Sequence, residues 1–425
     1  MIERIFKFFS NEKNLLLFIV LIYFLASFFQ YSFDSNFKIT GFYFGLPHIY
    51  TGDEPEYLLT LNSLLADGDF KLCNNYGQAM QGGCQAGITF AGIKEIAGRT
   101  EMIPCFEQGE RLPSRSILNA LIAATFIWPF AKDSCLLESM AIFMTLIVSL
   151  LVIFLSLKIM QYFDFSKKTI AISILALAFA SPFWFYSKTF WSEPYVSLFL
   201  VASVYCFLKK RFFASGLFLA LNLLIKPVNL IFVVVFFIFG FLKRDRKQII
   251  NLFIGFLLAL PFYFLINYFV FGDPLFISKA NEAFGGDVFS GLIAAFFAVK
   301  FGFLLTFPLF LFVIIGFYFF FRKRPFESLL FFSLLFGYML FWGQVWFVVL
   351  GTGGYSFRYF APLIPLMIIP IGFFLQENKC KKLSLLFWAI LFISFLINLQ
   401  AALTPLLIDN PPWFLIEYLF KTISI

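Results

Sequence analysis

The sequence predicts an all-α polytopic membrane protein, with about eleven transmembrane helices and one long loop after the first of them. Three observations predict this fold class. Of the 425 residues, 61% are hydrophobic and only 13% are charged, whereas about a quarter of a soluble domain is charged. Apolar runs of near membrane-spanning length recur along the chain. Basic residues cluster between alternate runs, as the positive-inside rule requires.

The first span is expected at about 14–31. It follows Arg4, Lys7 and Lys13, which place the N-terminus in the cytoplasm. No small-residue cleavage site follows this run, so we expect it to remain as a membrane helix and not to be removed as a signal peptide. The polar segment 32–135 is then an extracytoplasmic loop, rich in Gly, Asn, Gln and acidic residues.

Two juxtamembrane helices are expected within this loop. The first, about 56–66, begins near Pro55 and is amphipathic, since one face carries Leu58, Leu61, Leu64 and Leu65. The second, 116–131, is apolar but short, and Pro129 closes it, which suits a helix that lies in the interface. If it crossed the membrane, all later basic clusters would face outward, against the positive-inside rule.

The remaining spans follow in order, and we expect residues 1–400 to form a single transmembrane domain with 401–425 as an extracytoplasmic tail. No internal repeat is evident, unlike in the duplicated halves of many transporters. The expected spans are 136–157, 169–185, 194–208, 212–225, 227–242, 249–270, 304–321, 326–343, 359–375 and 383–400. The outer loops are then 186–193, 271–300 and 344–358, together with a turn at Lys226-Pro227.

Cysteine and histidine usage limits the metal chemistry. In an extracytoplasmic loop we expect a disulfide, either Cys73–Cys84 or a pair that includes Cys105, with the pairing among these and Cys135 left open. No Cys-x-x-Cys or Cys/His spacing occurs, and the single His48 excludes a zinc site built on histidines. The net charge of +8 follows the membrane topology, so we expect no nucleic-acid partner.

The stretch Thr51–Tyr57 carries three carboxylates soon after the first span: Asp53, Glu54 and Glu56. A carboxylate at a membrane surface could accept a proton from a hydroxyl, or ligate a divalent cation such as Mg²⁺ or Mn²⁺. Taken alone, the stretch could also be a solvated loop in which Asp53 caps the next helix. The acidic pair, the helix after it and the long outer loop occur together, and this combination favours a functional site. Glu56 suits the first helical turn.

This arrangement resembles the GT-C superfamily of polyprenyl-phosphate-sugar transferases, which includes the protein O-mannosyltransferases and the lipid A aminoarabinose transferase. Its hallmark is an Asp-Glu or Asp-Asp pair in the first outer loop, followed by juxtamembrane helices. Here the pair is Asp53-Glu54, and 116–131 stands where the family has a helix that does not cross. The resemblance covers the N-terminal half well and the C-terminal half only in general pattern.

The resemblance implies a function. The chain would be an inverting glycosyltransferase of the inner membrane that moves a sugar from a polyprenyl-phosphate donor to a lipid, glycan or protein acceptor at the extracytoplasmic face. Asp53 would be the general base and Glu54 a supporting or metal-associated carboxylate. The family often carries an acid at the start of a later helix, and Glu193 is the matching position, a further metal or substrate candidate.

Three further groups are candidates for substrate binding. Beside Glu193, Trp191 could stack on a sugar, as could Tyr57, while Lys188 could pair with phosphate or snorkel to the interface. Lys226, between two short apolar runs, could likewise meet an anion or snorkel. The stretch 351–359 combines glycines with Tyr355 and Arg358, so Arg358 could bind the donor phosphate bidentately and Tyr355 the substrate. Alternatively, it is a flexible loop with an interfacial arginine.

Other functions compete with the transferase. A transporter or flippase of a lipid-linked glycan would be expected to bury charges within its spans, and these spans carry almost none. An O-antigen polymerase or ligase typically places its large loop late in the chain. A membrane assembly factor would use the outer acids as an interaction surface.

Overall fold

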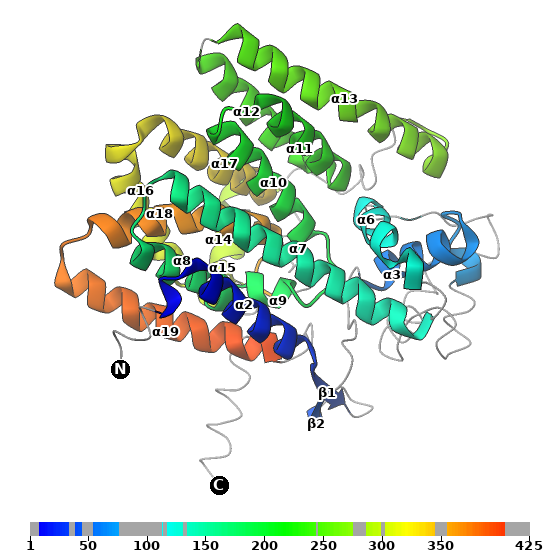
Figure 1. Ribbon diagram of the computed structural model, residues 1–425, viewed down its shortest axis with the longest axis horizontal. Coiled ribbons are helices and arrows are strands. Elements are labelled where there is room, and N and C mark those ends of the chain that lie inside the picture. The colour runs from blue at the N-terminus through cyan, green and yellow to red at the C-terminus, as the bar shows by residue number, and fades with distance from the viewer. Residues whose placement is uncertain are drawn as a thin grey trace.

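The computed structural model describes residues 8–33, 39–44, 54–75, 113, 117–130, 134–243, 245–274, 286–298, 302–344 and 355–403. Over these residues the chain is a bundle of helices (Figure 1), which confirms the predicted fold class. Five segments are long and apolar enough to cross a membrane. They are Leu136–Tyr162, Arg246–Phe271, Pro325–Gly343, Arg358–Glu377 and Lys381–Leu403.

A helix occupies each expected span, although several are shorter than expected or interrupted. A break at Ala180–Pro182 divides the third span, and Pro308 lies at the break in the eighth. The helices are α2 (Glu12–Ser27), α7 (Ser134–Tyr162), α8 (Lys167–Phe179), α9 (Phe183–Tyr186), α10 (Glu193–Leu208), α11 (Phe212–Ile225), α12 (Leu230–Leu242), α13 (Arg246–Phe271), α15 (Phe303–Thr306), α16 (Phe310–Lys323), α17 (Pro325–Gly343), α18 (Ile364–Glu377) and α19 (Lys381–Leu403). The short helical turns η4 (Pro227–Asn229) and η6 (Arg358–Leu363) precede α12 and α18.

The end of the first span was predicted wrongly. Helix α2 ends at Ser27, and Phe29–Phe33 forms strand β1, which pairs antiparallel with β2 (Ile39–Phe44). The segment Phe29-Gln-Tyr-Ser-Phe33 alternates aromatic and polar residues, a two-residue period that favours a strand over a helix. A hairpin therefore leads from α2 into the long loop.

A helix also lies where an outer loop was expected. Helix α14 (Val288–Phe297) falls within 271–300. Asp287 caps it, because its Oδ2 accepts a hydrogen bond from the Ser290 amide at 2.8 Å. With only 10 residues, it is too short to cross a bilayer.

Helices α11 and α13 pack with their backbones in close approach at one edge of the bundle, opposite the edge that carries α19 (Figure 1). A Cβ on Gly216 would lie 2.0 Å from the Leu252 carbonyl oxygen, and one on Gly255 would lie 2.0 Å from that of Phe213. Only glycine permits this contact. The other side of α13 exposes large apolar side chains such as Phe262 and Phe269, as a lipid-facing helix does.

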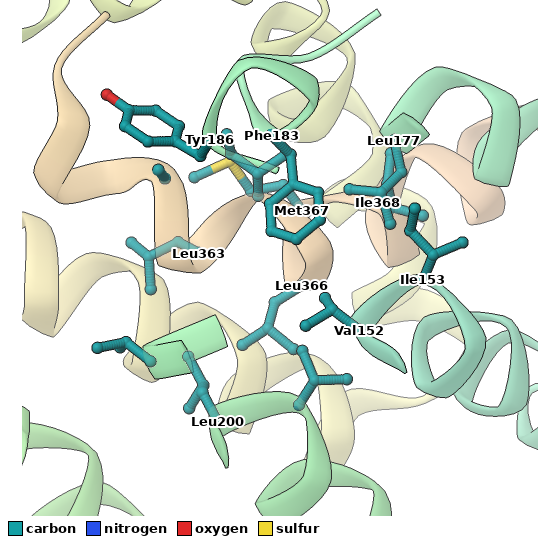
Figure 2. Close-up of a cluster of buried hydrophobic side chains, with 14 of the residues drawn as sticks. Val152, Ile153, Leu177, Phe183, Tyr186, Leu200, Leu363, Leu366, Met367 and Ile368 are labelled. Carbon is teal, nitrogen blue, oxygen red and sulfur yellow. The ribbon is translucent and has the colours of Figure 1, made fainter. Parts of the chain in front are cut away.

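The central core lies between α7, α8, α10 and α18. Figure 2 shows Val152 and Ile153 of α7 facing Leu366, Met367 and Ile368 of α18, all fully buried. Tyr186 of α9 lies at the margin of this cluster, with its hydroxyl directed away from the apolar side chains. The apolar core thus supports α9 and leaves the Tyr186 hydroxyl available for contact with other segments.

The juxtamembrane helices lie together near the N-terminal end of α7 (Figure 1). They are α3 (Glu54–Asn62), continued by a π-helical turn η1 (Ser63–Asp67), and α6 (Leu118–Ile127), continued by a 3₁₀ turn, η3 (Trp128–Phe130). Helix α6 has 10 residues and is too short to cross. The amphipathic character predicted for the first helix is wrong: all nine residues of α3 are buried, because α6 and α7 pack around it.

Candidate functional site

The loop between α9 and α10 joins α3 to the rest of the bundle. The Phe190 amide donates a 2.7 Å hydrogen bond to Glu54 Oε1. The Tyr57 hydroxyl donates to Ser192 Oγ at 3.3 Å, and the Tyr57 ring packs edge-on against Phe190 at 6.3 Å between centroids. The acidic start of α3 is therefore held against residues 190–193, which we call the linking loop.

Glu54 is a buried carboxylate, 4% exposed, at the N-terminal end of α3. Its bond from the Phe190 amide is charge-assisted and satisfies one carboxylate oxygen. The positive end of the α3 dipole favours both Glu54 and Glu56 in the first turn, where Glu56 was expected. Asp53, the predicted general base, lies outside the described residues, directly before Glu54.

Glu193 and Lys226 form a partly buried ion pair. Lys226 Nζ lies 2.7 Å from Glu193 Oε1, with the side chains 18% and 3% exposed respectively. Glu193 opens α10, where the helix dipole favours a negative charge. Lys226 lies at the break between α11 and η4, in an extended conformation. The ammonium group also lies 5.5 Å from the centroid of the Tyr359 ring.

Two asparagines fix the backbone at the break between α11 and η4, where Lys226 lies. Asn222 Nδ2 donates to the Val196 carbonyl at 3.1 Å, and Asn229 Nδ2 donates to Asn222 Oδ1 at 2.6 Å. Both side chains are fully buried. Neither asparagine was among the predicted site residues, although the sequence carries a signal for them: an asparagine inside an apolar run on each side of a Lys-Pro pair.

Arg358 opens η6 and lies between two aromatic rings. Its guanidinium carbon is 4.8 Å from the Trp191 centroid and 4.8 Å from the Tyr359 centroid, and its Nη2 donates to the Tyr359 hydroxyl at 2.9 Å. Tyr359 in turn stacks on Trp342 at 3.8 Å. Tyr359 therefore contacts both cations of the site, Lys226 and Arg358, and holds them by cation–π attraction. Sequence reasoning did not single out Tyr359 as a site residue.

Tyr355 lies beside this group but is bonded to other elements. Its hydroxyl donates to Asn398 Oδ1 at 3.1 Å, and its carbonyl accepts a hydrogen bond from the Tyr186 hydroxyl. The described hydrogen bond of Lys188 also goes elsewhere, to the Ala402 carbonyl near the C-terminal end of α19. Burial lowers the pKa of Lys188 to about 7. The structure thus brings together Glu54, Tyr57, Trp191, Glu193, Lys226 and Arg358, with Tyr355 adjacent and Lys188 bonded to a helix end.

Metal ligation through the described carboxylates would require a rearrangement. No group of three or more His, Cys, Asp or Glu side chains suited to a metal occurs among the described residues. Glu54 accepts from the Phe190 amide and Glu193 pairs with Lys226. A divalent cation at Asp53, Glu54 and Glu193 therefore stays a prediction. Cys73 is disulfide-bonded, as expected, to a partner whose side chain is outside the described part of the chain.

A comparison with solved structures finds the crystal structure of ArnT from Cupriavidus metallidurans in the apo state. The TM-score is 0.56 at 14% sequence identity, over 89% of this chain and 61% of that chain. The chain has an ArnT-like fold. It spans less than two thirds of the length of ArnT. This likeness is one of fold, and it agrees with the resemblance inferred from the Asp53-Glu54 loop. No protein-family model and no curated protein matches the sequence.

Proposed function

We propose that this protein is a membrane glycosyltransferase of the GT-C type. It would transfer a sugar from a polyprenyl-phosphate donor to a lipid, glycan or protein acceptor. One observation carries the proposal: the four-residue linking loop contacts the other charged groups that the structure brings together. Phe190 bonds the buried Glu54 of α3, Trp191 packs on Arg358, and Glu193 pairs with Lys226. The ArnT-like fold supports the proposal, since the carboxylates, cations and aromatic rings of the site converge within that fold.

Arg358 and Lys226 are the proposed ligands of the donor phosphate. Both lie against the Tyr359 ring, so two positive charges face one small region of the site. A guanidinium presents a planar fork that matches two phosphate oxygens, and Lys226 adds a point charge. In the described structure Glu193 neutralises Lys226, and a bound phosphate would share or replace that partner. As phosphate leaves the sugar, these cations would stabilise the charge that develops on it.

Asp53 is the proposed general base. In an inverting displacement the acceptor hydroxyl attacks the anomeric carbon from the face opposite the phosphate. The carbon–oxygen bond to phosphate breaks with its electron pair, and the hydroxyl proton passes to Asp53. Glu54, fastened to the linking loop, would hold the Asp53 backbone beside the substrate. The rings of Trp191 and Tyr57 are suited to contact the sugar.

The proposed orientation places the N-terminus in the cytoplasm and the site on the extracytoplasmic side. The basic clusters after α7, α10, α12, α16 and α18 then all face the cytoplasm. The disulfide at Cys73 supports this assignment, because disulfides persist in oxidising compartments.

A transfer assay tests the proposal. Purified protein in nanodiscs would be given a panel of radiolabelled polyprenyl-phosphate sugars with membrane lipid and glycan acceptors. We expect Asp53→Asn and Asp53→Ala to abolish transfer, with Asp164→Asn, an exposed acid after α7, as the control that retains it. Full activity of Asp53→Asn contradicts the role of the base. Movement of a lipid-linked sugar across the bilayer with no covalent product contradicts the transferase itself.

A further inference from the structure

The turn that leads into Arg358 is held in a strained conformation. Ser356 has a φ of 61°, in the left-handed region. Two other non-glycine residues of the described chain, Asp164 and Lys210, share this feature, but each lies two residues after the end of a helix, where a left-handed residue is common. Ser356 instead precedes η6 and is 1% exposed. Such strain persists only where the surroundings over-determine it, often at functional sites.

A buried polar network fixes this turn. Thr306 Oγ1 of α15 donates to Ser356 Oγ at 2.6 Å, its shortest bond, and the Gly302 and Phe303 carbonyls lie at 3.3 and 3.1 Å as alternative acceptors. Asn398 of α19 donates from Nδ2 to the Thr306 carbonyl at 2.9 Å and accepts at Oδ1 from the Tyr355 hydroxyl at 3.1 Å. The Tyr186 hydroxyl, directed out of the apolar core (Figure 2), donates to the Tyr355 carbonyl. Both Thr306 and Asn398 are fully buried.

The amide of Asn398 is fully used, which makes the network rigid. Its second Nδ2 proton goes to the Ser394 carbonyl at 2.8 Å, one turn earlier in α19. A buried amide with both donors and its acceptor engaged specifies one arrangement, since any shift leaves a polar group unpaired. The network therefore ties three separate elements, α9, α15 and α19, to the two residues Tyr355 and Ser356.

The conformation of this turn determines the position of Arg358. Only the fully buried Phe357 separates Ser356 from it, so the backbone conformation at Ser356 sets the direction in which the chain enters η6. In the observed conformation the Arg358 guanidinium lies between the Trp191 and Tyr359 rings. A relaxed φ at Ser356 would rotate the chain that carries Arg358 out of this position.

We infer that Thr306 and Asn398 are positioning residues for Arg358: they hold the strained Tyr355–Ser356 turn so that the guanidinium faces the donor-phosphate site. This inference rests on the proposed function, because it takes Arg358 as a ligand of the donor phosphate. It adds two residues from α15 and α19 that need not touch the substrate.

The first test compares two substitutions at Thr306. Thr306→Val removes the hydroxyl and keeps the shape, whereas Thr306→Ser keeps the hydroxyl. The readout is the dissociation constant for undecaprenyl phosphate in nanodiscs, beside the thermal unfolding midpoint. We expect Thr306→Val to weaken binding about ten- to a hundred-fold, the scale of a displacement near 1 Å, and Thr306→Ser to stay near wild type. Ser394→Ala is the matched control. Ser394 is buried in α19, and among the described residues its hydroxyl donates only to the Ala180 carbonyl.

The second test separates positioning from general stability. In the Arg358→Ala background, Thr306→Val should cause no further loss of affinity. An equal loss with and without Arg358 overturns the inference and leaves the proposed function intact. Wild-type affinity in Arg358→Ala overturns the phosphate assignment and the inference with it.

Ser356→Ala covers the case in which Thr306→Val does not fold. Alanine removes the hydroxyl that accepts from Thr306 and leaves the positive φ strained, so the turn should relax and this variant should bind undecaprenyl phosphate about ten-fold more weakly. Ser356→Gly is its control, because glycine adopts a positive φ without strain and should keep near wild-type affinity. Equal affinities of the two folded variants contradict the positioning role.

Discussion

Glu193→Gln tests the ion pair at the centre of the site. The substitution keeps the size of the side chain and removes the charge, so Lys226 loses its carboxylate partner at 2.7 Å. Breaking a buried pair costs about 3–5 kcal/mol, because the remaining charge is left in a poorly solvated place. Glu193 is 3% exposed but Lys226 retains 18% exposure, so we expect the lower end of that range, about 3 kcal/mol of unfolding free energy.

The assay is a double-mutant cycle with Glu193→Gln, Lys226→Met and the double variant, followed by unfolding in mixed micelles. Each single variant leaves one charged side chain without its partner, whereas the double variant leaves no unpaired charge. The loss in the double variant should therefore be about 2 kcal/mol smaller than the sum of the single losses. Additivity to within about 0.5 kcal/mol would contradict the ion pair, since it would mean that the two side chains do not interact in the folded protein.

Two further predictions concern packing and pH. Gly216→Ala should destabilise the protein by about 1–3 kcal/mol or more, because the new Cβ would meet the Leu252 carbonyl oxygen at 2.0 Å. Gly337→Ala is the control and should be tolerated, since its new Cβ would have Ile231 Cγ2 as its nearest neighbour, at 3.5 Å. Equal midpoints of thermal unfolding for the two variants would contradict the close approach of α11 and α13. Burial lowers the pKa of Lys188 to about 7 from 10.5, so over this range the unfolded chain binds more protons than the folded one, and stability should rise as pH increases from about 7 to about 10. Lys188→Met should flatten that rise in a series of unfolding midpoints against pH, and an unchanged slope would contradict the shifted pKa.

Much of the bundle could be predicted because local signals end its helices. Helix α11 has the predicted bounds 212–225, since a basic cluster precedes it and Lys226-Pro227 follows it. The hairpin after α2 has a local signal too, the alternation from Phe29 to Phe33, but the apolar run before it obscured the change of period. The full burial of α3 has no such signal, because it results from packing against α6 and α7.

Part of the site could also be predicted from local signals in the sequence. Charged residues at the ends of apolar runs, such as Glu193, Lys226 and Arg358, are visible in the sequence because a charge in a membrane protein is costly. Tyr359 is not, since aromatic residues make up 22% of the chain and one ring does not stand out. The pairing of Asn398 with Thr306 joins residues 92 positions apart, and only the folded structure shows that they meet.

The central claim is that a lipid phosphate binds between Arg358 and the loop that carries Asp53. A cryo-electron microscopy structure of the protein in nanodiscs with undecaprenyl phosphate tests it most directly. We expect density for the phosphate within hydrogen-bonding distance of the Arg358 guanidinium and Lys226 Nζ, beside the Tyr359 ring. A phosphate bound elsewhere, with Arg358 still enclosed by Trp191 and Tyr359 and Lys226 still paired with Glu193, would contradict it.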